Sequence, residues 1–320
     1  MTRGDGSVTS TGCSHRKHCR YMALFDVPET PPRIAVGQHA RSLRDYEWLE
    51  TAPMVAVHIL ALGVFWTGMS AGTWLLCAAL YFTRMFGVTG GYHRYFAHRT
   101  YKTGRVMQFL LALLAQSASQ RGVLWWAAHH RDHHKFSDTD RDVHSPVKFG
   151  FWHSHIGWIF DRNGPTDWPR VKDLSRYPEL VMLDKLWFLP PLLLGVAVYM
   201  IWGAMGLFGG FMLSTVLVWH GTFTINSLSH VWGSRRYPTT DDSRNNPVLA
   251  IITMGEGWHN NHHHFMGAAR QGFFWWEIDL TYYILRGLAA VGLVWDLKEP
   301  PSRVFDEDLR EPKPDDRAAA

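Results

Sequence analysis

The sequence predicts an all-α integral membrane protein, with four transmembrane helices in two hairpins and a helical cap that carries a multinuclear metal site. Two observations lead to this fold class. Four apolar stretches of the 320-residue chain are long enough to cross a bilayer. The polar segments between and after them contain three histidine clusters. Imidazole is costly to bury and is a good neutral ligand for iron, zinc or copper, so the clusters indicate metal binding.

The apolar stretches form two back-to-back pairs. They cover about residues 51–67, 71–88, 186–207 and 209–228, and only a few residues separate the members of each pair. Such short separations favour helical hairpins in a membrane over buried helices of a soluble protein. A shorter apolar run, residues 106–119, contains Gln108 and Gln116. We expect this run to lie at the membrane interface.

The positive charges predict the orientation of the chain. Lys and Arg are absent from both hairpin tips and frequent in residues 94–105, 131–185 and 235–244. By the positive-inside rule, both termini and the polar segments are cytosolic. The membrane domain is expected at residues 51–299, with a cap of residues 89–185 and 229–299. Residues 1–50 are expected to be polar and partly disordered, and residues 300–320 to be a disordered tail.

Charge and cysteine content narrow the class of protein. The net charge of +4 suits an anionic membrane surface or a phosphorylated substrate. No zinc-finger or helix-turn-helix pattern accompanies the charge, so no nucleic-acid partner is expected. The three cysteines, Cys13, Cys19 and Cys77, form no disulfide framework, which is consistent with a reducing compartment. The polar first fifty residues show no cleavable secretory signal.

The spacing within each cluster predicts how its histidines are presented. On a helix, residues at i, i+3 and i+4 share one face, so HRDHH and HNNHH would each form a tridentate patch. In HRYFAH, His93 and His98 would lie about 140° apart on an ideal α-helix. We therefore expect these two to straddle a helix end or to serve different metals. The two patches comprise His130, His133 and His134, and His259, His262 and His263.

The number of donors predicts two metals. A structural zinc site takes four ligands and a catalytic one usually three, whereas the clusters offer eight histidines. The zinc-protease pattern HExxH and the ExxH pattern of soluble di-iron bundles are both absent. The site is therefore expected to be almost entirely nitrogen-ligated. The isolated histidines are expected to be surface or packing residues: His15, His18, His39, His58 and His220.

Five motifs lie between residues 53 and 295: GYHRYFAHRTYK, WAAHHRDHHKFSDTDRDVH, HSHIGW, NSLSH and GEGWHNNHHHF. Together they resemble the membrane Δ9 acyl-CoA desaturases of the stearoyl-CoA type. That family pairs a first box HxxxxH with two boxes HxxHH, as this sequence does. The related alkane and sterol oxygenases usually space their first box HxxxH.

The resemblance implies four transmembrane helices beneath a cytosolic cap, and two irons bound by nine histidines. It also implies an asparagine that reaches one iron through water. Asn226 and His230 are four residues apart and would extend one face of the last span towards the site, although the sequence alone is equally consistent with ordinary helix–helix hydrogen bonding. The corresponding ligands are His93, His98, His130, His133, His134, His230, His259, His262 and His263, with Asn226 as the water-mediated contact.

Four further histidines lie close to these motifs. His129 stands where the animal enzymes have Asp, and His264 where they have Thr. We expect both to lie beside the ligands or to be bystanders. His144 and His155 match family positions that are not iron ligands, and we expect them to orient the cap.

The reaction implied is O2-dependent desaturation of a saturated C16–C18 acyl chain to a cis-Δ9 product at two irons. Removing hydrogens from an unactivated methylene pair needs an oxidant stronger than any side chain, so the metal must activate O2. A fatty-acyl hydroxylase with the same iron chemistry is the alternative. A membrane metal transporter is a more remote one, because the predicted spans carry almost no metal-binding side chains.

Substrate contacts follow only from the resemblance. Trp126 and Thr222 resemble the residues that kink the acyl chain. Tyr81 and Met85 lie on the span that shapes the far end of the tunnel in the family, and their bulk predicts a preference for sixteen carbons over eighteen. The acyl group could be carried on CoA, a carrier protein or a phospholipid. Candidate partners for CoA phosphates, which could equally face the membrane surface, are Arg131, Lys135, Lys148, Arg235 and Arg236.

Ligand imidazoles usually donate their second N–H to a carboxylate, and four carboxylates lie within a few residues of the boxes. The sequence has no HPGG motif of a fused cytochrome b5, no GxGxxG and no iron–sulfur cysteine spacing. Electrons are therefore expected from a separate ferredoxin, rubredoxin or cytochrome b5 with its reductase. The candidate carboxylates are Asp132, Asp138, Asp142 and Glu256.

Overall fold

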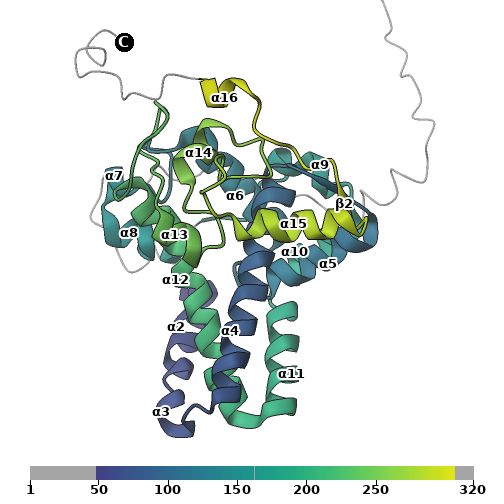
Figure 1. Ribbon diagram of the computed structural model, residues 1–320. Coiled ribbons are helices and arrows are strands. Elements are labelled where there is room, and N and C mark those ends of the chain that lie inside the picture. Colours follow the sequence, from purple (N-terminus) through teal and green to yellow (C-terminus); the bar gives the residue numbers. More distant parts are fainter. Residues whose placement is uncertain (1–47, 162, 307–320) are drawn as a thin grey trace, which may run out of the picture. The chain divides into compact units, whose positions relative to one another are not determined.

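Long apolar helices form a stalk beneath a cap of short helices and loops (Figure 1). The computed structural model describes residues 48–161 and 163–306, so the predictions for residues 1–47 and 307–320 lie outside it. The segment expected to be a disordered tail begins instead with a short helix at residues 303–306. The described part is mostly helical and has almost no sheet, as predicted. Its one sheet pairs two residues from each strand, β1 (Lys102–Thr103) and β2 (Val294–Trp295).

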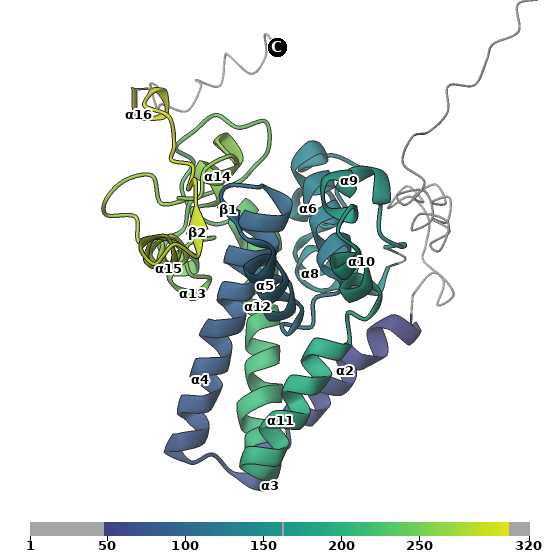
Figure 2. The ribbon, with the colours of Figure 1, turned by 90° about the vertical axis from the view of Figure 1, so that its right-hand side faces the viewer.

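Four legs make up the stalk (Figures 1 and 2). The first is α2 (Trp48–Ala61) with α3 (Val64–Thr67), and the second is α4 (Ala71–Phe86), which continues into the π-helix η2 (Gly87–Ala97). The third is α11 (Leu189–Met205). The fourth is the π-helix η5 (Gly206–Met212) with α12 (Leu213–Ser227), followed by η6 (Leu228–His230). The legs correspond to the four predicted apolar stretches.

Two helical stretches are apolar and long enough to cross a membrane, Ala71–Ala97 and Leu189–His230, whereas Thr51–Thr67 is apolar but shorter. The longer stretch bends back on itself at Gly203 and so supplies two legs. The surface of the legs is strongly apolar: Phe65 is 86% exposed and Trp66 80% exposed. Such a surface suits lipid rather than water. Four complete crossings remain a prediction.

Polar side chains join two legs inside the stalk. Arg84 on α4 is fully buried and donates to Thr215 Oγ1 at 2.6 Å and to the Phe211 carbonyl at 3.3 Å. It also donates to the hydroxyl of Ser214. A buried guanidinium must use its donors, so these bonds fix α4 against η5 and α12.

The cap is built around two helices that follow the second leg. One face of α5 (Arg105–Gln116) is buried, while Val106 and Leu110 on the other are 75% and 51% exposed. Next comes α6 (Val123–Phe136), which carries the HRDHH motif as predicted. The smaller cap elements are α7 (Pro146–Phe149), α8 (Phe151–His155), η3 (Gly157–Phe160), η4 (Trp168–Val171), α9 (Lys172–Ser175), α10 (Pro178–Lys185), α13 (Pro247–Ile252), α14 (His259–His264), α15 (Leu280–Ala290) and α16 (Arg303–Asp306).

The first histidine box corrects one of the alternatives drawn from the sequence. His93 lies in η2 and His98 is the C-cap of that helix, with His98 N–H donating to the His93 carbonyl at 3.1 Å. This i→i+5 bond is the π-helical pattern, which brings residues five apart onto one face. The two histidines therefore straddle a helix end, as expected. The structure does not support the alternative that they serve different metals, since both lie in one group of five histidines. The 140° estimate behind that alternative assumed α-helical geometry.

The bend at Gly203 predicts a sensitive position. Its φ of 63° and ψ of −157° are accessible to glycine and strained for other residues. We expect Gly203→Ala to lower the free energy of unfolding by about 1–3 kcal/mol, measured by thermal unfolding in detergent. Gly72→Ala is the control, because a Cβ there meets only Ser70 Oγ at 3.7 Å. Equal melting temperatures for the two variants would contradict this account.

Candidate metal centre

Nine histidines converge in the cap in two groups. The first contains five and the second four, and in each group the candidate ligand atoms all lie within 4.8 Å of one another. The nine are those that the sequence singled out. The five-histidine group is His93, His98, His130, His134 and His262, and the four-histidine group is His133, His230, His259 and His263.

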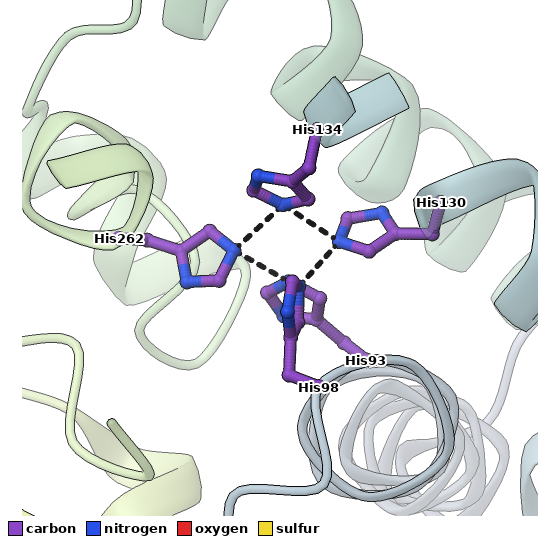
Figure 3. A group of neighbouring side chains, drawn as sticks. All are labelled: His93, His98, His130, His134 and His262. Carbon is purple, nitrogen blue, oxygen red and sulfur yellow. Dashed lines mark hydrogen bonds between the residues drawn. The ribbon is translucent and has the colours of Figure 1, made fainter. Parts of the chain in front are cut away.

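The five-histidine group is a ring of imidazole edges (Figure 3). The Nε2 atom of His130 lies 2.8 Å from that of His98 and 3.0 Å from that of His134. The Nε2 atom of His262 lies 2.9 Å from that of His134 and 3.0 Å from that of His93. Three elements contribute, namely η2 with its C-cap, α6 and α14. His130 and His134 come from one face of α6, as the i, i+4 spacing predicts, whereas α14 supplies only His262 to this group.

The four-histidine group lies beside the first and shares two of its helices. His133 from α6 and His259 and His263 from α14 meet His230, which ends the fourth leg. The Nε2 atoms of His230 and His259 are 3.1 Å apart. Because α6 and α14 each contribute to both groups, the two groups form one centre. The prediction of two tridentate patches is wrong in this respect, because each helix divides its three histidines between the groups.

Carboxylates accept the outward N–H of four of these histidines. His93 Nδ1 lies 2.5 Å from Glu256, and His133 Nδ1 lies 3.1 Å from Asp142. His230 Nδ1 lies 2.8 Å from Asp138. His263 Nδ1 lies 2.5 Å from Asp241. An Nδ1–H bound in this way leaves the Nε2 lone pair facing inward, the tautomer that metal binding needs.

Sequence reasoning found three of these carboxylates and missed the fourth. Asp138, Asp142 and Glu256 lie near the boxes in the sequence, whereas Asp241 is 22 residues from His263. Asp132 instead forms an ion pair with Arg170. The side chain of Gln271 was also missed; its Nε2 lies 3.2 Å from Nδ1 of His93. No spacing rule connects Asp241 or Gln271 to a box.

Burial keeps most of the centre neutral. It lowers the pKa well below the usual histidine value in His98, His130, His134, His259 and His262, and the neighbouring imidazoles lower it further. Burial also lowers the pKa of His263 to about 4, although Asp241 opposes it. Burial opposes ionisation of Asp138, but the hydrogen bond and charge of His230, with hydrogen bonds from Ser145 and the Asp242 N–H, together lower the pKa of Asp138 to about 2. Burial thus favours the uncharged form of six of the nine imidazoles. In His133 burial acts in the same direction, but Asp142, Asp241 and Asp138 together raise its pKa.

The donor set fits metal ions. Nε2 of His263 is buried and has no hydrogen-bond partner among the described residues, although three other imidazole nitrogens lie within 4.8 Å. A buried polar atom without a partner is costly, and so are lone pairs that face one another. A cation bound at the middle of each group would accept the lone pairs of these imidazole nitrogens. All-imidazole donors suit iron, zinc, copper or nickel.

Four histidines near the motifs lie outside the two groups. Both ring nitrogens of His129 face backbone carbonyls, Trp125 O at 3.0 Å and Asn163 O at 3.1 Å. His264 stacks on Tyr237 with ring centroids 4.0 Å apart. His144 lies 3.4 Å from Asp142, and His155 contacts Ser227 of α12 at 3.0 Å. His155 thus connects the cap to the fourth leg.

Two further histidines, His58 and His220, form a chain with His155. His220 Nδ1 lies 3.0 Å from His155 Nε2, and His220 Nε2 lies 3.1 Å from His58 Nε2. They are packing residues between legs, in line with the prediction for isolated histidines.

An apolar cavity of about 430 Å³ reaches the centre. His130 and Asn226 line it together with Trp126 and Thr222, two of the predicted substrate contacts. Trp126 stacks on the His130 ring with centroids 4.8 Å apart. Thr222 Oγ1 accepts a hydrogen bond from Gln120 at 3.0 Å. The cavity therefore places an apolar ligand directly against the five-histidine group.

The structure does not bring Tyr81 and Met85 into this cavity. Tyr81 donates to the Ile252 carbonyl at 2.7 Å, and Met85 is buried in the main apolar core. Both lie against Gly221, where an added Cβ would be 2.8 Å from Met85 Cε and 3.1 Å from the Tyr81 hydroxyl. They fill the space between α4 and α12, behind the wall that Thr222 helps to form.

Fold and site together define a helical protein with apolar helices of membrane length and a buried, histidine-rich centre able to bind metal. A model of the fatty acid desaturase family matches residues 69–295. The chain belongs to this family.

Curated relatives agree with that assignment. A palmitoyl-monogalactosyldiacylglycerol delta-7 desaturase of Arabidopsis thaliana is 37% identical, covering 92% of this chain and 80% of the relative. The delta-9 acyl-lipid desaturase 2 of the same plant is 37% identical, covering 92% and 96%. An icosanoyl-CoA 5-desaturase of Limnanthes douglasii is 37% identical, covering 84% and 77%. All three names state a desaturase, whereas the position of the double bond and the carrier of the acyl chain differ among them.

The carboxylates behind the histidines predict a measurable effect on metal binding. Asp241→Asn removes the anionic acceptor of His263, and such changes typically cost about 10–100-fold in metal affinity. Competition with a chelator measures the affinity. Asp242→Asn is the matched control, because its carboxylate pairs with Arg235 instead. Equal affinities in the two variants would show that Asp241 does not support the site.

Proposed function

We propose that this protein introduces a cis double bond at Δ9 of a saturated C16–C18 fatty acyl chain, using O2 and two irons. The nine histidines are the proposed ligands, with Asn226 as a contact through water. One observation carries the proposal: an apolar cavity reaches His130 of the five-histidine group, and the four-histidine group lies beside that group. Iron bound there would supply the O2 activation that removal of unactivated hydrogens requires.

The chain's own residues bind and orient the substrate in this proposal. Trp126 and Thr222 lie on the cavity wall beside His130, where they would fix the part of the acyl chain that reacts. The bond from Gln120 to Thr222 holds the wall in place. Apolar walls also exclude water, which protects a reactive oxidant from side reactions. The position of the new double bond along the acyl chain is then set by how the cavity places that chain, because its methylenes are chemically alike.

The proposal includes an arrangement in the membrane. The four legs would each cross the bilayer, with the centre and both termini on the cytosolic side. The apolar surface of the legs and the basic residues of the cap support this orientation. Electrons would come from a separate donor, a ferredoxin, a rubredoxin or cytochrome b5 with its reductase.

The reaction is tested by product analysis. We expect cells that express the protein with a compatible donor to gain a cis-9 monoene, identified by gas chromatography with mass spectrometry. His263→Ala should abolish it, because it removes one ligand of the four-histidine group. His264→Ala, the adjacent residue outside both groups, should retain it. A hydroxy acid in place of the alkene would select the hydroxylase alternative, and a product that forms without O2 would refute the mechanism.

Chain length is tested at the space between α4 and α12. Met85→Ala opens room next to Gly221, so we expect the C18-to-C16 product ratio to rise about tenfold. Met200→Ala is the control, because Met200 is 76% exposed on α11. The proposed role of Met85 in the preference for sixteen carbons fails if both variants keep the wild-type ratio.

A further inference from the structure

The carboxylates of the metal centre are divided unevenly between its two groups. Among the described residues, three of the four imidazoles in the four-histidine group have a carboxylate at Nδ1, against one of the five in the five-histidine group. We propose that this uneven charge makes the iron of the four-histidine group the first of the two to be oxidised. The inference rests on the two-iron centre of the proposed function and adds the order in which its irons change oxidation state.

The negative charge behind the four-histidine group is buried and has no cationic partner. The side chains of Asp138, Asp142 and Asp241 are 5%, 1% and 6% exposed, respectively. No Lys or Arg of the described residues forms an ion pair with any of the three. Besides its histidine, Asp138 accepts from neutral donors, the Ser145 hydroxyl at 2.6 Å and the Asp242 N–H at 2.8 Å. Their charge is therefore neither neutralised nor well screened by water.

The one carboxylate of the five-histidine group has an arginine beside it. Glu256 lies 3.1 Å from Nη2 of Arg94, which is fully buried. Arg94 also pairs with Asp279 at 2.9 Å, so one cation faces two carboxylates. At His262 the outward nitrogen meets the neutral amide of Gln271, at 3.5 Å. Less negative charge therefore acts on the five-histidine group than on the four-histidine group.

A second arginine adds positive charge beside the five-histidine group. The guanidinium of Arg131 donates to the carbonyl of Ala97, the residue before His98, at 2.9 Å. Its partner Asp173 lies at 2.7 Å, but this carboxylate is 40% exposed, so water screens it more than the buried ones. Two helices that supply ligands to this group, η2 and α6, thus each carry an arginine close to those ligands.

Charge close to a bound iron sets its reduction potential. Oxidation adds one positive charge, which nearby carboxylates stabilise and nearby arginines destabilise, and these energies are large where water is excluded. A carboxylate that accepts from Nδ1–H also makes the imidazole a stronger donor to the metal. A fifth imidazole favours oxidation too, but it brings no charge, whereas the four-histidine group has three carboxylates against one. Charge therefore decides the order.

The iron beside the apolar cavity is then the one that keeps its electron longer. His130 of the five-histidine group lines the cavity, whereas no described residue of the four-histidine group does. Oxidation therefore begins at the iron whose ligands lie outside the cavity wall. An electron donor reduces the iron beside the cavity at a higher potential than the other iron.

The order is tested by redox titration of the wild-type protein, loaded with 57Fe and kept free of O2. Mössbauer spectroscopy follows the oxidation state of both irons. We expect two separate one-electron steps, with a mixed-valence sample between them. Nitrogen electron–nuclear double resonance of that sample counts the imidazoles on the ferric ion, and we expect four. Five imidazoles on the ferric ion, or a single two-electron step, would overturn the inference.

Variants that remove one charge assign each step to its group. Asp142→Asn should make the first oxidation less favourable by about tenfold in its equilibrium constant, or about 59 mV for one electron, and change the second less. Glu256→Gln should shift the second step instead. Asp140→Asn is the matched control, because its carboxylate is exposed and pairs with Lys148. A first step that moves in Glu256→Gln and stays unchanged in Asp142→Asn would contradict the proposed order.

Metal content separates a failure of this inference from a failure of the proposed function. Each variant is loaded with excess Fe2+, because losing a carboxylate also weakens metal binding, and its iron is counted before the titration. A wild-type protein that holds no iron would refute both the two-iron function and the order of oxidation. Two irons per chain that oxidise in the reverse order would exclude the inference alone and leave the two-iron function standing.

Discussion

The burial of nine imidazoles whose nitrogens face one another constrains the rest of the structure. Neutral nitrogens at about 3 Å repel when both present lone pairs, and burial removes the water that would otherwise separate them. Four ionised carboxylates, Asp138, Asp142, Asp241 and Glu256, approach the outer nitrogens of these rings. Their combined charge matches that of two divalent cations. The cap is thus a ligand shell that metal ions would complete.

The same centre connects the cap to the stalk. The second leg continues through η2 to His98, and the fourth leg ends at His230, so both reach the centre directly. Arg94 lies on the same π-helix and is fully buried between Glu256 and Asp279. Asp279 in turn caps α15 by accepting from Tyr282 N–H at 3.0 Å. A change in the position of a leg would therefore move candidate ligands, so the stalk helps to position the candidate metal centre.

The sequence predicted most of this centre because ligands on regular helices obey a simple spacing. His130, His133 and His134 fall on one face of α6, and the HNNHH motif behaves alike on α14. The first box did not follow this rule, because a π-helix changes the angle between residues five apart. The contacts of Asp241 and Gln271 were not predicted, because only folding brings these two residues close to the imidazole rings. Tyr81 and Met85 were assigned to the right helix, but periodicity does not say which neighbour a side chain meets.

The central claim is that the two histidine groups each hold one iron. The most direct test is elemental analysis of the purified protein by mass spectrometry, combined with Mössbauer spectroscopy of 57Fe-enriched samples. The account predicts two irons per chain, and about one remaining after His259→Ala removes a ligand of the four-histidine group. A single metal per chain, or zinc in place of iron at full activity, would contradict it.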